Sequence, residues 1–170
     1  MIIFLIILQV IVFTMAFAYI FGLVEKDRYE FRKYLTDICK KEKIYIHYCY
    51  DVDELNKIVF GSDVTIHEKA AGTYCHCENY TQLENLSKKY PRIYITKKPQ
   101  KYGLNSLNQT INVMTFAHEV GHHFSIKSGD KSERAADRYA VKLFKEFFPK
   151  YKSILYFLLL THYLNRNKND

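Results

Sequence analysis

The longest hydrophobic run of the chain lies at its start, where residues 2–24 are almost entirely apolar. As a helix this run would be roughly 34 Å long, enough to cross the hydrocarbon core of a bilayer. A signal peptide would begin with basic residues, and no lysine or arginine precedes the run, although Ala16–Ala18 could serve as a cleavage site. We therefore predict an uncleaved transmembrane anchor over residues 1–24, with a signal peptide as the alternative.

Basic residues follow this run and none come before it. They are Lys26, Arg28, Arg32 and Lys33. Because positive charge favours the cytoplasmic side of a span, we expect a single-pass membrane protein whose remaining chain faces the cytoplasm. Residues 25–170 are enough for one domain with its own hydrophobic core.

Helical and extended hydrophobic patterns alternate along this second part, which predicts an α+β domain. Apolar residues recur at helical spacing within residues 26–41, at Phe31, Tyr34, Leu35 and Ile38. Residues 43–50 alternate as a strand does. The further predicted elements are helices at 51–60, 106–127 and 133–144 and strands at 64–67, 72–77 and 92–96. We expect the strands to form a small sheet against the helix at 106–127.

A last apolar stretch covers residues 151–164. At about 14 residues it is short for a membrane span. We expect it to pack against the domain, with a place at a membrane interface as the second alternative.

Composition and charge narrow the choice of partners. The chain is 48% hydrophobic and carries a net charge of +7. Its lysines are scattered in short groups among acidic residues, and no nucleic-acid-binding motif accompanies them. We expect no nucleic-acid partner, because attraction to an anionic membrane surface is a simpler use of this charge.

The string His118-Glu119-Val120-Gly121-His122 reads H-E-x-x-H. On a helix it places two imidazoles one turn apart on one face with a glutamate beside them, an arrangement that holds a catalytic zinc ion. Glu119 would then accept the proton of an activated water. His123 points about 100° away from His122, so we expect it to be no ligand. Gly121 weakens a helix, and a close approach of another backbone would explain it.

The third zinc ligand is expected in the residues that follow this helix. Gly129 fits the end of the helix, and Asp130 or Ser132 fits the N-cap of the next one. Glu133 would then face the histidines from the first turn of the second helix and complete the protein's share of the zinc site. The alternative is that Glu133 only stabilises the helix N-terminus by its charge.

Asp137 lies one turn after Glu133 on the same helix face. Histidines that bind zinc commonly donate their other ring N–H to a carboxylate, and we predict this role for Asp137. The alternative is an exposed aspartate paired with Arg134, Arg138 or Lys142.

The four cysteines suggest a second metal hypothesis at Cys75-His76-Cys77. Structural zinc sites usually space paired cysteines by two to four residues, so this spacing is unfavourable. In a reducing cytoplasm we expect free thiols at Cys39, Cys49, Cys75 and Cys77.

These motifs together resemble the ImmA/IrrE metallopeptidases, a thermolysin-like group of zincins. The resemblance covers roughly residues 35–148 and rests on His118–His122, Glu133–Ala140, Ala71–Tyr74 and Arg92–Thr96. It implies a minimal zincin-like domain in which His118, His122 and Glu133 bind zinc and Glu119 is the general base. It also implies a protein substrate, often a repressor. The chain departs from the family at Ala135, where many members have glutamate, and in its apolar start. Membrane zincins of the HtpX type share H-E-x-x-H but have several spans.

We therefore expect a membrane-anchored, zinc-dependent peptidase acting on a protein or peptide. The alternative is a membrane-tethered zinc-containing binding or regulatory module, whose metal site would be closed by a fourth ligand such as His123, His76 or a cysteine. Tyr74, His76 and Tyr139 are the candidates for stabilising the oxyanion. By analogy with zincins, the strand at 92–96 or at 72–77 is a candidate edge for an extended substrate.

Overall fold

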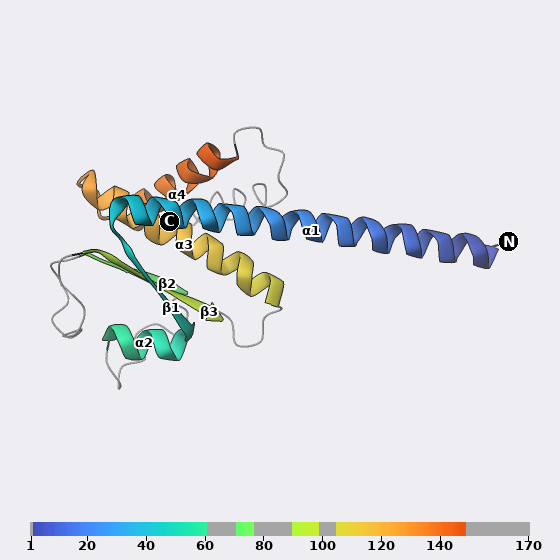
Figure 1. Cartoon of the computed structure of the whole chain (residues 1–170), viewed down its shortest axis with the longest axis horizontal. Helices are drawn as coiled ribbons and strands as arrows, with labels where there is room; N and C mark the ends of the chain where they lie inside the picture. Colours follow the sequence, from blue (N-terminus) through green and yellow to red (C-terminus); the bar gives the residue numbers. More distant parts are fainter. Residues whose placement is uncertain (1, 61–70, 77–89, 99–104, 149–170) are drawn as a thin grey trace.

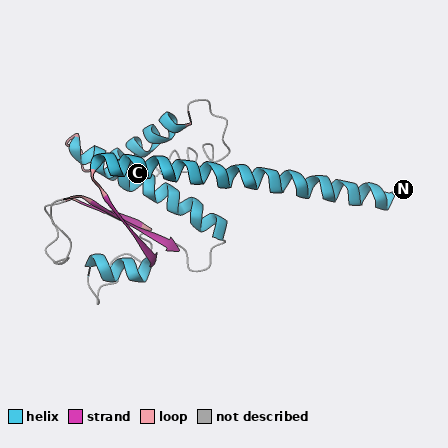
Figure 2. Ribbon diagram, in the orientation of Figure 1, coloured by secondary structure: helices cyan, strands magenta, loops and turns pink. Residues whose placement is uncertain are grey.

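The computed structural model describes residues 2–60, 71–76, 90–98 and 105–148, which form an α+β fold (Figures 1 and 2). Its elements are α1 (Ile2–Glu42), β1 (Tyr45–Asp51), α2 (Val52–Phe60), β2 (Gly72–Cys75), β3 (Arg92–Lys98), α3 (Asn105–Lys127) and α4 (Glu133–Phe147). The helices predicted at 51–60, 106–127 and 133–144 and the strands predicted at 43–50, 72–77 and 92–96 are present, with bounds that differ by a few residues, whereas the helix predicted at 26–41 is the second part of the longer α1. The strand predicted at 64–67 and the apolar stretch 151–164 lie outside the described residues.

β3 is the central strand of the three-stranded sheet, whose order is β1-β3-β2. β1 runs parallel to β3, with Ile46 opposite Ile93, and β2 runs antiparallel to it, with Tyr74 also opposite Ile93. Of the two candidate substrate edges, the one at 92–96 is wrong, because β3 is hydrogen-bonded on both sides. Among the strands that the structure describes, β2 lies at an edge of the sheet.

Helices cover both faces of the sheet (Figure 1). On one face, Ile93 and Ile95 pack in a core with residues of α1, α3 and α4, among them Phe31, Phe116 and Phe144. On the other face, a smaller core joins Cys49, Cys75 and Tyr94 to Leu55 and Val59 of α2. Since both faces are covered, Ile93, Tyr94 and Ile95 are fully buried.

The prediction of a transmembrane anchor at residues 1–24 is wrong, and with it the predicted single-pass membrane localisation. Within the described part of the chain, no helix combines the length and the apolar character that crossing a membrane requires. The apolar run is not a separate segment: it is the first part of α1, which continues without a break through the charged residues 25–33. The second half of α1 packs on the domain through Phe31, Leu35 and Cys39, which are fully buried.

Three cysteines are free thiols buried in the two cores, as expected: Cys39, Cys49 and Cys75. Burial raises the pKa of Cys39 and Cys75 to about 12 and that of Cys49 to about 11. These thiols are therefore protonated at neutral pH and act as small apolar side chains. Cys77 lies outside the described residues.

Candidate metal centre

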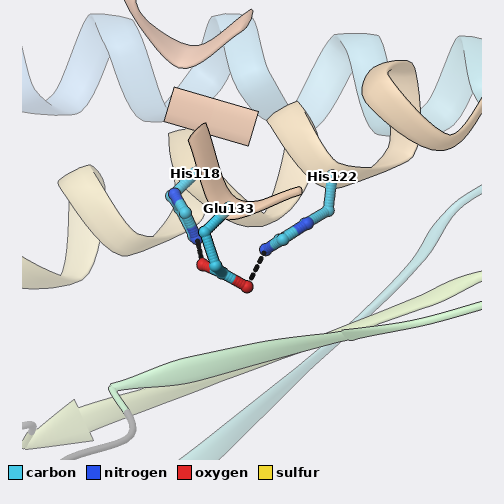
Figure 3. A group of neighbouring side chains, drawn as sticks. All are labelled: His118, His122 and Glu133. Atoms are coloured by element: carbon cyan, nitrogen blue, oxygen red, sulfur yellow. Dashed lines mark hydrogen bonds and ion pairs between the residues drawn. The ribbon is translucent and has the colours of Figure 1, made fainter. Parts of the chain in front are cut away.

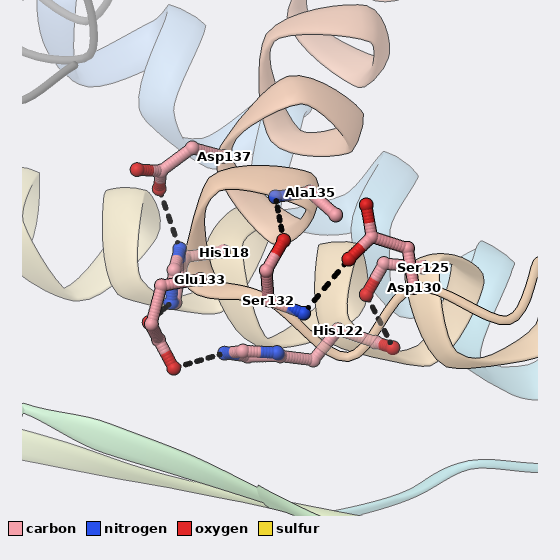
Figure 4. A network of polar contacts seen from close by, with 8 residues as sticks. All are labelled: His118, His122, Ser125, Asp130, Ser132, Glu133, Ala135 and Asp137. Carbon is pink, nitrogen blue, oxygen red and sulfur yellow. Dashed lines mark hydrogen bonds and ion pairs between the residues drawn. The ribbon is translucent and has the colours of Figure 1, made fainter.

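The turn between α3 and α4 determines where Glu133 lies. Gly129 adopts a positive φ of 86° after the end of α3, where glycine is favoured. Ser132 is the N-cap of α4, and its hydroxyl oxygen accepts a hydrogen bond from the backbone N–H of Ala135 at 3.1 Å (Figure 4). Asp130, the other predicted cap, instead accepts from the backbone N–H of Ser132 at 3.0 Å. Glu133 thus becomes the first residue of α4.

α3 and α4 approach each other at the backbone. A Cβ atom added at Gly121 would lie 2.3 Å from the carbonyl oxygen of Ala136, closer than real contacts allow. The expected reason for a glycine inside the H-E-x-x-H helix is therefore confirmed. This contact brings the first turns of α4 directly onto the face of α3 that carries the histidines.

Three side chains converge between these helices (Figure 3). The carboxylate of Glu133 lies between the two imidazoles, with one oxygen 3.0 Å from Nε2 of His118 and the other 3.3 Å from Nε2 of His122. One ligand atom from each of the three residues lies within 4.8 Å of the others. His118, His122 and Glu133 form a triad that could hold a metal ion.

Asp137 contacts the imidazole of His118 on the side opposite Glu133. Its carboxylate lies 2.7 Å from Nδ1 of His118, so Nε2 of that ring points toward Glu133 (Figure 4). Asp137 is 1% exposed, which excludes the alternative of an exposed aspartate. Two of the proposed partners have other ion pairs, because Arg138 contacts Asp130 and Lys142 contacts Glu146.

The charges of this group are strongly coupled. Burial alone would lower the pKa of His118, but the hydrogen bonds to Asp137 and Glu133 outweigh burial and raise the pKa to about 9. Hydrogen bonds from His118 and His122 lower the pKa of Glu133. Without a metal ion, a proton on His118 therefore balances part of the negative charge of Asp137 and Glu133. A bound metal cation would balance the same charge.

Glu119 lies next to the triad and is 5% exposed. The backbone of β2 passes directly beside it, since a Cβ atom at Gly72 would lie 3.4 Å from Cγ of Glu119 and 2.5 Å from Cγ2 of Thr115. Sequence reasoning missed Gly72 as a residue that shapes the site. A glycine within a strand pattern was the available signal, because it often indicates a close approach of another part of the chain.

The other predicted site residues lie at different distances from the triad. The ring of Tyr74 lies parallel to that of His122, with centroids 6.5 Å apart, whereas Tyr139 stacks on Phe124. His123 contacts Tyr74 and Glu42 and does not join the triad. Among the described residues, the metal-type group contains His118, His122 and Glu133 and no fourth ligand from His76 or a cysteine.

Asp137→Asn is expected to weaken metal binding by about 10- to 100-fold, because the hydrogen bond that orients His118 loses its charge. Equilibrium titration with zinc in the presence of a competing chelator measures the change. Asp130→Asn is the matched control, since Asp130 contacts Ser132 and Arg138 but no ligand. An equal loss of affinity in both variants would contradict the orienting role of Asp137.

Metal affinity is expected to rise with pH. Below pH 9 the metal must displace the proton of His118, so this group alone raises the affinity about tenfold per pH unit between roughly pH 6.5 and 9. Without metal, stability changes with pH in the opposite direction. In chelator-treated protein, the free energy of unfolding includes a full contribution from protonated His118 below about pH 6.5, and this contribution is lost as the pH rises through 9. Thermal unfolding with zinc and with chelator, measured from pH 6 to 9.5, should diverge as pH rises, and parallel curves would contradict this reasoning.

Comparison with known proteins adds no relative: no protein-family model, curated protein or solved structure matches the chain.

Proposed function

We propose that this chain is a zinc-dependent metallopeptidase that hydrolyses peptide bonds of a protein or peptide substrate. The observation that carries the proposal is the convergence of His118, His122 and Glu133 beside the buried carboxylate of Glu119. Two imidazoles and one carboxylate are a donor set that suits zinc, and three protein ligands leave a coordination position for water or substrate. The resemblance of the motifs to ImmA/IrrE metallopeptidases supports the same activity and suggests a regulatory protein as the substrate.

The residues of the site have separate tasks in this proposal. When bound, zinc supplies a Lewis acid and lowers the pKa of a water molecule. Glu119 accepts the proton of the attacking water and then donates it to the leaving amine. Asp137 keeps His118 oriented toward the triad, and the lack of a side chain at Gly72 allows β2 to lie close to Thr115 and Glu119.

The alternative is a zinc-containing binding or regulatory module without proteolytic activity. A closed structural site needs four protein ligands, and the described residues supply three at this position. A purely structural zinc site also needs no general base, so it would not explain the buried carboxylate of Glu119 beside the ligands. The peptidase is therefore the function that the geometry favours.

The first experiment measures zinc per chain and peptide cleavage on the same preparation of the full chain. We expect one zinc per chain, markedly less in Glu133→Ala, and new N-termini in a mixed peptide library analysed by mass spectrometry. The zinc chelator 1,10-phenanthroline should abolish the cleavage. One bound zinc without chelator-sensitive cleavage would contradict the peptidase and favour the binding module, whereas undiminished zinc in Glu133→Ala would contradict the ligand set.

A further inference from the structure

The outer face of α4 carries a row of positive charges. All exposed residues of this helix are charged, and the basic ones are Arg134, Arg138, Lys142 and Lys145. Because successive residues of an α-helix are about 100° apart, these four side chains fall within an arc of about 80°. Ala136, Ala140 and Leu143, which are buried, lie on the opposite side of the helix. The four basic residues therefore form one surface that points away from the core, called the basic face below.

Neighbouring carboxylates balance only part of this charge. Arg138 donates to a carboxylate oxygen of Asp130 at 2.9 Å, and Nζ of Lys142 lies 4.0 Å from a carboxylate oxygen of Glu146. Among the described residues, the other two members of the basic face have no ion-pair partner. The basic face thus keeps an excess of positive charge at the surface.

The exposed side of α1 shows how an ordinary solvated helix of this chain differs. Its lysines are interspersed with acidic residues and pair with them, as Lys26 does with Glu30 and Lys40 with Asp37. Mixed charges of this kind leave little net field, whereas charges of one sign that are gathered on one face attract an oppositely charged partner. The basic face of α4 therefore differs from a surface that serves only solubility.

A cavity of about 330 Å³ opens beside the basic face. It lies between α4 and the turn after α3, and its lining residues are Ser128, Asp130, Ala135, Arg138, Tyr139 and Lys142. Arg138 and Lys142 are one helical turn apart, so an acidic side chain that enters the cavity contacts both cations. The ion pair between Arg138 and Asp130 shows that a carboxylate fits this guanidinium group.

The spacing of the basic residues suits an extended peptide. Positions 134, 138 and 142 follow one another at intervals of four residues, roughly 6 Å along the helix axis. In an extended chain, every second side chain points to the same side and the repeat is roughly 6.6 Å. The distance from Arg134 to Lys145 is roughly 16 Å along the axis, which about five extended residues span. Acidic residues at alternating positions would therefore meet successive cations.

Two other anionic partners suit this face less well. A helix that binds a membrane surface inserts apolar side chains among the lipids, and the exposed residues of α4 include none. Single-stranded nucleic acid is bound by aromatic rings on which its bases stack, whereas Tyr139 in the cavity is half-buried and stacks on Phe124. A protein segment needs only its carboxylates to bind here.

The basic face begins next to the triad. Arg134 directly follows Glu133, whose carboxylate lies between the two imidazoles. A protein chain bound at the triad therefore lies within a few residues of the first turn of α4. Acidic residues a short distance from the cleaved bond are close enough to reach the basic face.

We propose that the basic face of α4 binds an acidic segment of the protein substrate, with one carboxylate in the cavity beside Arg138 and Lys142. The inference rests on the proposed peptidase function and names the class of its substrate: a protein with acidic residues at alternating positions near the cleaved bond. Ion pairs on this face are exposed to solvent, so each contributes only a few-fold to affinity and is weakened by salt. Their sum recognises the substrate and takes no part in hydrolysis.

Two triple variants isolate the basic face. The α4 triple is Arg134→Gln, Lys142→Gln and Lys145→Gln, and the matched α1 triple is Lys26→Gln, Lys33→Gln and Lys40→Gln. Both remove three exposed positive charges, and each contains one lysine that pairs with a glutamate four residues later. Arg138 stays unchanged, because its partner Asp130 also accepts from the backbone of Ser132 in the turn before Glu133.

The first test measures binding to the full chain in chelator, so that the reading does not depend on metal. The probes are a short fluorescent peptide with glutamates at alternating positions and the same peptide with glutamines instead. We expect the acidic peptide to bind, more weakly as salt is added, and roughly tenfold more weakly to the α4 triple. The α1 triple should bind it within about twofold of wild type. No binding of the acidic peptide, equal binding of the glutamine peptide, or an equal loss in both triples would overturn the proposal.

The same preparations are then mixed with vesicles of phosphatidylcholine and phosphatidylserine, and with a single-stranded thymidine oligonucleotide. We expect each of these probes to behave alike toward the α4 triple and the α1 triple. If the α4 triple lost binding of the vesicles or of the oligonucleotide while the α1 triple kept it, the basic face would belong to that partner and the proposal would be overturned.

The second test separates this inference from the proposed function. Substrates that share a cleaved sequence from the peptide library carry a flanking segment with glutamates or with glutamines, placed before the bond in one pair and after it in another. In one of the two pairs we expect zinc-loaded wild type and the α1 triple to prefer the acidic substrate roughly tenfold in kcat/KM, and the α4 triple to lose most of this preference. Cleavage without a preference in either pair would overturn the role of the basic face and leave the peptidase untouched. Binding of the acidic peptide without any cleavage would overturn the peptidase and assign the basic face to a binding module.

Discussion

Glu119→Gln is expected to lose turnover by about 10²- to 10⁴-fold while the chain retains its metal, because glutamine cannot accept the proton of the attacking water. Glutamine has nearly the same shape, so the buried position beside the triad and the close approach of β2 at Gly72 should persist. Zinc per chain and the rate of cleavage of one peptide from the library, measured on the same sample, give the two readings. Zinc content should equal that of wild type within error.

His118→Ala gives the opposite pattern and serves as the comparison. Removal of this imidazole leaves Asp137 and Glu133 without the group that both contact, so the metal is expected to be lost together with activity. Loss of zinc in Glu119→Gln would contradict the division between a base and its neighbouring ligands. Cleavage by Glu119→Gln at the wild-type rate would exclude Glu119 as the base.

The parts of the site that the sequence predicts are those that depend on local geometry. Two histidines four residues apart share a helix face whatever surrounds the helix, and a positive φ at Gly129 followed by a cap at Ser132 follows from the turn itself. The reason for Gly121 was also predictable, because an unfavourable residue within a helix requires a compensating contact. The contact with Ala136 provides that compensation.

The parts that escaped prediction depend on how distant segments pack. The position of Arg92–Lys98 in the middle of the sheet follows from pairing with strands on both sides, which hydrophobic alternation does not encode. Glu42 and His123 are 81 positions apart, so nothing in the sequence links them. The apolar run at residues 2–24 shows the same limit: its hydrophobicity predicted a membrane anchor, whereas the run is the first part of the 41-residue helix α1.

Gly121→Ala is expected to destabilise the fold and weaken metal binding together. The added methyl group would lie 2.3 Å from the backbone oxygen of Ala136, so α4 must move away from α3. Overpacking typically costs about 1–3 kcal/mol, and a clash with backbone atoms belongs to the upper part of this range, above the roughly 1 kcal/mol that alanine gains over glycine in a helix. Movement of α4 displaces Glu133 and Asp137 from the histidines. Thermal unfolding in chelator and zinc titration measure the two effects separately.

Gly129→Ala distinguishes this steric effect from the general consequences of replacing glycine. A Cβ atom at Gly129 would meet nothing within 4 Å, but its φ of 86° strains any other residue. We expect this variant to lose about 1 kcal/mol of stability and to bind zinc almost as wild type does, since the α3–α4 contact is unchanged. If Gly121→Ala were instead more stable than wild type, with full zinc affinity, the backbone contact that brings Glu133 to the two histidines would not exist in solution.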